Sequence, residues 1–236
     1  MKISALQKTT LIDYPGKVAA TVFLAGCNFR CPWCYSKELV LPELIAQQPQ
    51  ISQEEFFAFL KEKQGLLEGV VLCGGEPTIN PDLSQFIIQI KNLGFQVKLD
   101  TNGSNPTMLN GLIYQSLLDY VAMDIKLPKD RYPLVFGDKL SVEDIEQSIR
   151  ILKNRNIDFE FRTTCAPGIH TVIDLEKMAK WIGQEVTGKP PKYFLQNFRP
   201  ERNIDSEFET KKPFSKEFFD EALTKIKPFV PDCRLR

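Results

Sequence analysis

Residues 69 to 100 read GVVLCGGEPTINPDLSQFIIQIKNLGFQVKLD, and this stretch decides the class of fold. The apolar run Gly69–Cys73 predicts a buried strand, and Phe95–Leu99 predicts a second one. Between them, Pro81–Leu93 predicts a helix, because it begins with proline and Gly94 follows directly after its end. A strand, a helix and a further strand in this order predict a right-handed unit with parallel strands.

The same alternation of short apolar runs and amphipathic segments continues on both sides of this unit. The predicted strands are Val18–Ala25, Gly69–Cys73, Phe95–Leu99, Tyr120–Ile125, Ile157–Thr164 and Tyr193–Phe198. One predicted helix opens at Ser52; the others are Pro81–Leu93, a segment within Thr107–Leu118, Ser141 to about Asn154, Leu175–Ile182 and roughly Lys216–Lys227. This pattern predicts a parallel α/β sheet, either doubly wound or an incomplete barrel, because a full eightfold barrel needs about 250 residues.

The composition narrows the class of protein. A chain of 236 residues with 43% hydrophobic residues suits one domain, with a core over about residues 17–200 and a C-terminal helical extension over about residues 201–236. The 30 basic and 30 acidic side chains cancel, which disfavours nucleic acid and anionic membranes as partners. The first residues lack the apolar run of a signal peptide, so we expect a cytoplasmic protein whose thiols stay reduced.

Polar residues follow the predicted strands at the point where each strand ends. They are Cys27, Gly74-Gly75-Glu76, Asp100-Thr101-Asn102-Gly103, Asp124 with Lys126, Arg162 with Thr164, and Gln196 with Asn197. Parallel α/β folds bind ligands at the carboxyl ends of their strands. The sequence therefore predicts one shared site at this edge of the sheet.

The stretch Cys27-Asn-Phe-Arg-Cys31-Pro-Trp-Cys34 is the strongest chemical signal. In a reducing compartment, a tight group of cysteines more often binds a metal than forms disulfides. A closed zinc site needs four protein ligands, and the single histidine of the chain excludes a histidine-rich zinc centre. Three thiolates suit a [4Fe–4S] cluster whose remaining iron binds a small molecule. A zinc knuckle or three unrelated thiols is the alternative.

The Cys-x3-Cys-x2-Cys spacing, with Trp33 before the last cysteine, resembles the signature of the radical S-adenosylmethionine (SAM) enzymes. Gly74-Gly75-Glu76-Pro77 follows a predicted strand, as the Gly-Gly-Glu motif of that superfamily does. The resemblance covers nearly the whole chain and implies a partial (β/α)6 barrel of the TIM-like kind. Together with these motifs, residues 10 to 16, which read TLIDYPG, resemble the activating proteins of anaerobic ribonucleoside-triphosphate reductase. These belong with the pyruvate formate-lyase activases, which install glycyl radicals.

The resemblance implies a set of site residues. Cys27, Cys31 and Cys34 would hold the [4Fe–4S] cluster, and the amino and carboxylate groups of SAM would bind its open iron. The implied cofactor-binding residues are Trp33 near the adenine, Gly74, Gly75 and Glu76 near the methionine amino group, Asp100 and Asn102 near the ribose or a cation, Asp124 and Lys126 near the methionine, and Arg162 for the carboxylate. The strand-six histidine of the formate-lyase activases is missing, and Gln196 or Asn197 would replace it.

Structural roles compete with several of these assignments. A plain strand-to-helix turn explains the glycine pair, ordinary packing explains Trp33, and structural ion pairs explain the single charged residues. We expect the only histidine, His170, to lie on the surface, and Cys165 and Cys233 to pack as small apolar side chains.

The resemblance implies an oxidoreductase with no catalytic residue beyond the cluster and its cofactor. The cluster, reduced by a flavodoxin- or ferredoxin-type donor, would cleave SAM to a 5′-deoxyadenosyl radical. That radical would take hydrogen from a backbone glycine of a partner, with anaerobic ribonucleotide reductase as the expected partner. One alternative is a small-molecule enzyme like the 7-carboxy-7-deazaguanine synthases, and another is a non-catalytic metal-binding module. A Rossmann-like binder is disfavoured, because no G-x-G-x-x-G follows the first strand.

Overall fold

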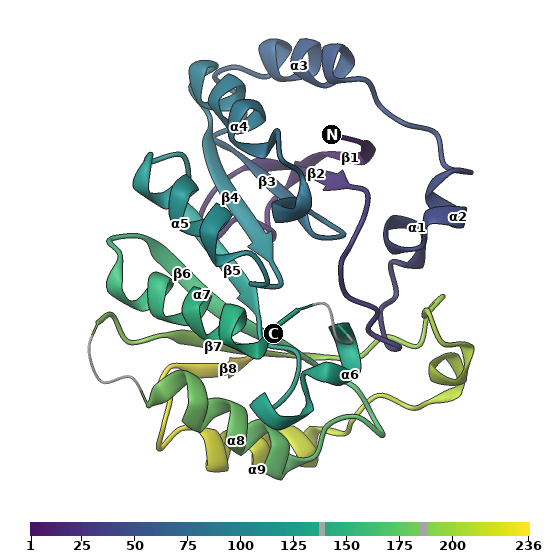
Figure 1. Cartoon of the computed structure of the whole chain (residues 1–236), viewed down its shortest axis with the longest axis vertical. Helices are drawn as coiled ribbons and strands as arrows, with labels where there is room; N and C mark the ends of the chain where they lie inside the picture. The colour runs from purple at the N-terminus through teal and green to yellow at the C-terminus, as the bar shows by residue number, and fades with distance from the viewer. Residues whose placement is uncertain (137–139, 185–187) are drawn as a thin grey trace. The chain divides into compact units, whose positions relative to one another are not determined.

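The computed structural model describes residues 1–136, 140–184 and 188–236, which form two compact units (Figure 1). Unit 1 consists of Met1–Asn28, Ser36–Thr101 and Thr107–Val121. Unit 2 consists of Phe29–Tyr35, Asn102–Pro106 and Ala122–Arg236. The short segment Phe29–Tyr35 therefore belongs to unit 2, although its neighbours in the chain on both sides belong to unit 1.

The sheet of unit 1 contains β1 (Ile3–Thr10), β2 (Ala19–Leu24), β3 (Gly69–Gly74) and β4 (Gln96–Thr101). β2, β3 and β4 are parallel neighbours, as the sequence predicts for this stretch. β1 is an additional strand that pairs antiparallel with β2. The sequence pattern does not predict β1, because the strand is largely polar and only its two end residues are buried.

The helices of unit 1 are α1 (Lys37–Val40), α2 (Pro42–Ile45), α3 (Gln53–Glu62), α4 (Leu83–Asn92) and, apart from its first residue, α5 (Pro106–Tyr114), with the 3-10 turn η1 (Pro77–Ile79). The hydroxyl of Ser52 accepts a hydrogen bond from the amide of Glu55 at 3.0 Å and caps α3. Phe56 of α3 stacks on Phe86 of α4 with ring centroids 5.2 Å apart. These apolar faces close the core of unit 1 around the buried strands.

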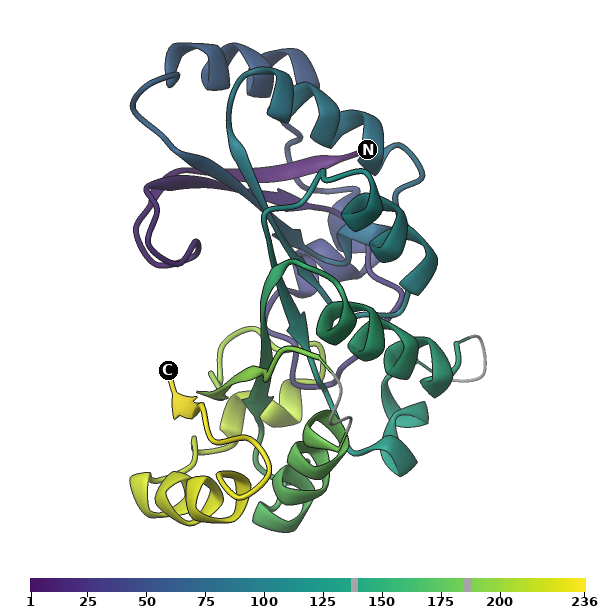
Figure 2. The same ribbon diagram turned by 90° about the vertical axis from the view of Figure 1, so that its left-hand side faces the viewer.

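Unit 2 contains the parallel neighbours β6 (Asp158–Cys165), β7 (Lys192–Asn197) and β8 (Cys233–Leu235). Its helices are α6 (Pro133–Phe136), α7 (Val142–Asn154), α8 (Val172–Gly183) and α9 (Lys216–Ile226), with the 3-10 turns η2 (Lys129–Arg131) and η4 (Ser206–Thr210). α8 and α9 lie side by side in both views (Figure 1 and Figure 2). The short strand β8 was not predicted, because three residues are too few for a periodic pattern.

Strand β5 (Tyr120–Asp124) begins in unit 1 and ends in unit 2. At its start, the amide of Asp119 donates to the carbonyl of Val97 at 2.9 Å, and after its end the amide of Ile125 donates to the carbonyl of Arg162 at 2.8 Å. All six predicted strands are confirmed, with ends within one or two residues of the prediction. Within the described ranges, no helix is long and apolar enough to cross a membrane.

Candidate functional site

The three clustered cysteines lie on the loop that follows β2. Cys27 belongs to the first segment of unit 1, whereas Cys31 and Cys34 belong to unit 2, where the amide of Cys34 donates to the carbonyl of Cys31 at 3.0 Å. All six cysteines of the chain carry thiols rather than disulfides, so the donor chemistry fits an iron–sulfur cluster. Among the described residues, no three side chains of His, Cys, Asp or Glu lie close enough together to hold a metal ion.

The loop segment is fixed within unit 2 on its N-terminal side by apolar packing and one backbone bond. The ring of Phe29 packs edge-on against Tyr132 at 6.4 Å and also contacts Phe136 at 5.7 Å. The amide of Arg30 donates to the carbonyl of Val135 at 2.7 Å. The turn after β5 therefore positions the residues directly before Cys31.

His170 is buried, with 3% of its surface exposed, so the prediction that it lies on the surface is wrong. Its Nδ1 accepts from the amide of Ala166 at 3.0 Å, so the proton resides on Nε2, which donates to the carbonyl of Lys126 at 2.8 Å. Burial lowers the pKa of this imidazole to about 4, although both hydrogen bonds and Asp174 oppose the shift. The neutral ring thus connects the loop after β6 to Lys126, two residues after the end of β5.

Trp33, in the cysteine loop, packs against this histidine. The two rings meet edge to face with centroids 5.6 Å apart, and only 4% of the surface of Trp33 is exposed. Its carbonyl accepts a hydrogen bond from the side-chain amide of Asn203 at 2.9 Å. Ordinary packing therefore accounts for the position of the ring, and an adenine contact stays a prediction.

Asp124 and Lys126 form an ion pair, with Nζ of the lysine 2.7 Å from the carboxylate. Burial by itself lowers the pKa of the ammonium group. Asp124 together with Cys31 and Cys34 outweighs that effect and holds the pKa above its usual range. The amide of Lys126 also donates to the hydroxyl of Tyr132 at 3.0 Å. Unit 2 thus brings the predicted Asp-x-Lys pair close to two of the three predicted cluster ligands.

Arg162 on β6 has a partner that the sequence analysis did not identify. Its Nε lies 2.7 Å from a carboxylate oxygen of Glu160, a buried residue on the same face of the strand. Arg236 approaches the same carboxylate with two nitrogens, at 2.8 and 3.3 Å. Burial by itself raises the pKa of Glu160, but the two guanidinium groups outweigh this effect and hold the pKa below its usual range. The structural ion pair is therefore present, whatever else Arg162 binds.

Gly74 and Gly75 allow two backbone segments of unit 1 to approach closely. A Cβ on Gly74, whose φ is +116°, would lie 2.4 Å from the carbonyl of Leu24, and one on Gly75 would lie 1.9 Å from the carbonyl of Gly26. The amides of Gly75 and Glu76 donate to these same two carbonyls, at 2.8 and 2.7 Å. The strand-to-helix turn thus requires both glycines before any ligand is considered.

Glu76 is buried, and its Oε1 gathers three donors. They are the amide and hydroxyl of Thr78, at 3.1 and 2.6 Å, and the hydroxyl of Thr101 at 2.7 Å. The carboxylate therefore joins the turn after β3 to the end of β4.

Asp100 on β4 forms an ion pair with Lys98, which is completely buried. The alternation Lys98-Leu-Asp100 could have predicted this pair, because alternate residues of a strand share a face. Asn102 is also buried, and its Oδ1 accepts from the amide of Ser104 at 2.9 Å in a local turn.

Of the two residues considered as replacements for a strand-six histidine, Asn197 has a structural role. Its amide group donates to the carbonyl of Phe214 at 2.9 Å, while its Oδ1 accepts from the amides of Phe214 and Phe198 at 3.1 and 2.9 Å. Gln196 is half-buried on β7, where it pairs in register with Thr164. The role of Gln196 toward a ligand stays a prediction.

Cys165 and Cys233 are buried in unit 2, as predicted. Burial raises the pKa of the Cys165 thiol far above its usual range and that of Cys233 to about 12, so both stay neutral. Cys73, in unit 1, packs against the cluster of Tyr14, Ala19, Val71 and Tyr120.

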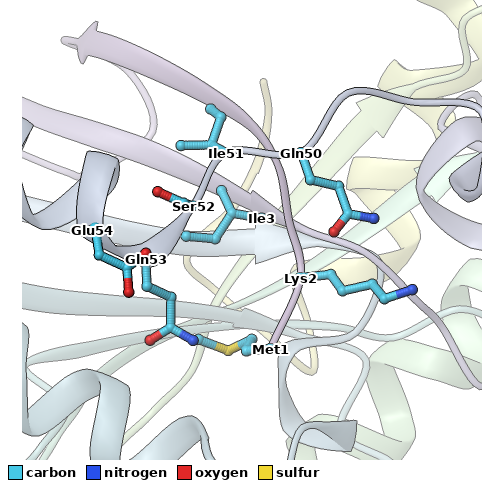
Figure 3. A pocket seen from close by; sticks show the side chains of 8 residues that line it. All are labelled: Met1, Lys2, Ile3, Gln50, Ile51, Ser52, Gln53 and Glu54. Atoms are coloured by element: carbon cyan, nitrogen blue, oxygen red, sulfur yellow. The ribbon is translucent and has the colours of Figure 1, made fainter.

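A cavity of about 410 Å³ in unit 1 contains none of the predicted site residues (Figure 3). It is lined by Met1, Lys2, Ile3 and residues 50–54. We assign no function to it.

Comparison with known proteins identifies the family. The Radical SAM superfamily matches residues 21–182. A relative from Methanocaldococcus jannaschii, whose name marks it as a candidate glycyl-radical enzyme activating enzyme, is 32% identical over 243 residues, covering 99% of this chain and 95% of that protein. The 7-carboxy-7-deazaguanine synthase of Methanopyrus kandleri is 24% identical, covering 79% of this chain and 89% of that enzyme.

Among solved structures, Streptococcus suis SuiB bound to S-adenosylmethionine is similar, with a TM-score of 0.60 at 10% identity over 92% of this chain. The matched part is 51% of the SuiB chain, so this chain spans about half its length, and the likeness concerns the fold. The chain belongs to the radical SAM superfamily: it is an α/β enzyme of the TIM-like fold, and the family implies a [4Fe–4S] cluster and SAM as its cofactors.

Proposed function

We propose that this enzyme activates a glycyl-radical enzyme, with anaerobic ribonucleoside-triphosphate reductase as its target. The observation that carries the proposal is the similarity to the Methanocaldococcus jannaschii protein over 99% of the chain. The cluster, once bound and reduced, would supply the electron for cleaving SAM to methionine and a 5′-deoxyadenosyl radical, and that radical would take hydrogen from the target glycine. A flavodoxin- or ferredoxin-type protein is the proposed electron donor.

In this proposal, Cys27, Cys31 and Cys34 hold the cluster and leave one iron for SAM. Their spacing within eight residues supports this role, and so does the chemistry of thiolate donors. The ammonium group of Lys126 lies close enough to Cys31 and Cys34 for its charge to interact with theirs. It would stabilise these thiolates and the negative charge of the loaded loop, while Asp124 keeps the lysine protonated.

The other predicted residues would orient SAM. We propose that Arg162 binds its carboxylate, with Glu160, which also pairs with Arg236, holding the guanidinium group of Arg162 in place. Further proposed contacts come from Trp33, Gly74, Gly75, Glu76, Asp100, Asn102, Asp124 and Gln196. Both units would belong to one catalytic domain over residues 1–236.

The first experiment is anaerobic reconstitution of the full chain, followed by iron and sulfide analysis and a SAM cleavage assay under reducing conditions. We expect about four iron and four sulfide per chain. Cys31→Ala should lose both the cluster and the cleavage, whereas the matched control Cys165→Ala should keep them. A Cys31→Ala variant that retained a normal cluster and normal cleavage would contradict the proposal.

The second experiment identifies the target. The loaded enzyme, SAM and a reductant are mixed with an anaerobic ribonucleotide reductase, and the glycyl radical is measured by electron paramagnetic resonance (EPR). A doublet that depends on both SAM and the enzyme supports the proposed target.

A small-molecule radical SAM activity is the second candidate, because the Methanopyrus kandleri synthase aligns with 79% of this chain. Formation of 7-carboxy-7-deazaguanine from that enzyme's substrate, without a glycyl radical in the reductase, would favour it.

A further inference from the structure

A segment near the C-terminus lies along the cysteine loop within unit 2. The amide of Ile204 donates to the carbonyl of Cys34 at 2.9 Å, and the amide of Asp205 donates to the carbonyl of Pro32 at 3.0 Å. Between them, the carbonyl of Trp33 accepts from the side-chain amide of Asn203 at 2.9 Å. Residues 203–205, called the strap below, thus hold three consecutive carbonyls of the loop.

Asn203 is the side chain on which the strap depends. It has no exposed surface, and its Nδ2 also lies 3.3 Å from the carbonyl of Arg199. Because both neighbours are carbonyls, only the NH2 group can face them, which fixes the orientation of the amide. Its Oδ1 is then buried with no hydrogen-bond partner among the described residues, which is unfavourable for stability.

The backbone beside Asn203 is strained as well. Arg202 has a φ of +47°, in the left-handed region that favours glycine. Such a conformation persists only where surrounding contacts enforce it. An unpaired buried oxygen and a strained neighbour are costs that the contacts with the loop offset.

The strap completes the support of the loop around Cys34. Before Cys31, the turn after β5 holds Phe29 and Arg30, and beneath Trp33 lies His170. Without the strap, the carbonyls of Pro32, Trp33 and Cys34 would each lose the one hydrogen bond described here. The directions of the Cys31 and Cys34 side chains depend on the backbone between them.

We propose that Asn203 is a positioning residue, which holds the backbone between Cys31 and Cys34 in place so that these two thiols accept and retain the cluster. This inference rests on the proposed function, because it takes Cys31 and Cys34 as cluster ligands. Asn203 acts through the backbone of the loop and takes no part in the cleavage of SAM.

The test uses the full chain, reconstituted anaerobically, with iron loss to a chelator as the readout. Asn203→Ala removes the donor. Asn203→Asp keeps a side chain of nearly the same size but replaces the NH2 group that faces the two carbonyls with a carboxylate oxygen, which repels them. We expect both to lose iron at least several-fold faster than the wild type, with Asp the faster of the two. The EPR signal of the reduced cluster with SAM should also change, which a loss of global stability alone would not cause.

Asn154→Ala is the matched control, because its side chain likewise donates to a carbonyl, that of Arg150, at 2.9 Å, but far from the loop in sequence. It should lose iron at the wild-type rate. Folded Asn203 variants that keep their iron and EPR signal as the wild type does would overturn the proposal. In that case, Cys31→Ala separates the two proposals. If Cys31→Ala kept its cluster, the proposed function would fail as well; if Cys31→Ala lost its cluster, only the role of Asn203 would be refuted.

Hydrogen exchange of the wild-type protein without cluster gives an answer even if the variants do not fold. The amides of Ile204 and Asp205 should exchange slowly, because both donate to loop carbonyls before any cluster binds. Exchange at the rate of an unstructured chain would overturn the proposal.

Discussion

The Gly74–Glu76 turn of unit 1 and the Cys31–Cys34 loop of unit 2 carry the two motifs of the family, but they are stabilised differently. The turn is shaped by the residues of its own motif, whose missing Cβ atoms let its amides reach the carbonyls of Leu24 and Gly26. The loop depends on side chains outside its own motif, those of His170 and Asn203. A motif can therefore be recognisable in sequence while its geometry is set elsewhere.

We expect the largest loss of stability from a substitution that disrupts the Gly74–Glu76 turn. Gly75→Ala would place a Cβ 1.9 Å from the carbonyl oxygen of Gly26, so the backbone must shift and lose its hydrogen bonds. We expect the free energy of unfolding to fall by about 4 kcal/mol, measured by urea denaturation. Gly111→Ala in α5 is the control, because nothing lies within 4 Å of its added Cβ, and it should be neutral or slightly stabilising. Equal stabilities of the two variants would refute the steric explanation.

The next effect concerns the support of the loop and depends on pH. Because the pKa of His170 is about 4 when folded and about 6.5 when unfolded, the unfolded chain binds a proton first as pH falls. His170 should therefore make stability decline from about pH 6.5 down to about pH 4, by on the order of 3 kcal/mol, and have no further effect below that range.

A single histidine makes this measurement direct. Its one set of imidazole NMR signals should not titrate in the folded protein above about pH 5, and His170→Phe should lose this part of the pH dependence of stability. A native titration midpoint near 6.5 would show that the ring is not held neutral.

A smaller loss of stability is expected from removing one hydrogen bond to Glu76 in the turn. Thr101→Val removes one of the three donors to the buried Oε1 of Glu76 and keeps the shape of the side chain. We expect a loss of about 1–2 kcal/mol in the free energy of unfolding, because the buried carboxylate loses a donor. Thr224→Val, whose hydroxyl donates to the carbonyl of Asp220 on the exposed side of α9, should cost clearly less. A Thr101→Val variant as stable as the wild type would show that the turn does not depend on Thr101.

The smallest effect concerns the charge beside the loop. Lys126→Gln removes the ammonium group that interacts with Cys31 and Cys34, so their thiolates should become less favourable. In the protein without cluster, we expect these two cysteines to react a few-fold more slowly with a maleimide at neutral pH. The exposed Lys212→Gln serves as the control, and an unchanged rate for Lys126→Gln would contradict the electrostatic interaction.

Sequence patterns identified the alternating strands and helices because hydrophobic periodicity is a local property. The cap of α3 by Ser52 and the burial of Cys165 followed from the same local reasoning. β1 was missed because most of its residues are polar and only its two end residues are buried, and it forms a strand through its pairing with β2. Lys98 was missed because a charged residue inside a strand looks unfavourable until its partner Asp100 is considered.

By itself, the sequence determined the α/β class, the positions of the six predicted strands along the chain and the three clustered thiols. Each of these follows from residues close together in the chain. Only the tertiary structure decided that His170 is buried, that Asn197 holds Phe214, and that Asn203 supports Trp33. A lone polar residue is buried only if partners for its polar atoms lie nearby, and those partners come from distant segments that folding brings together.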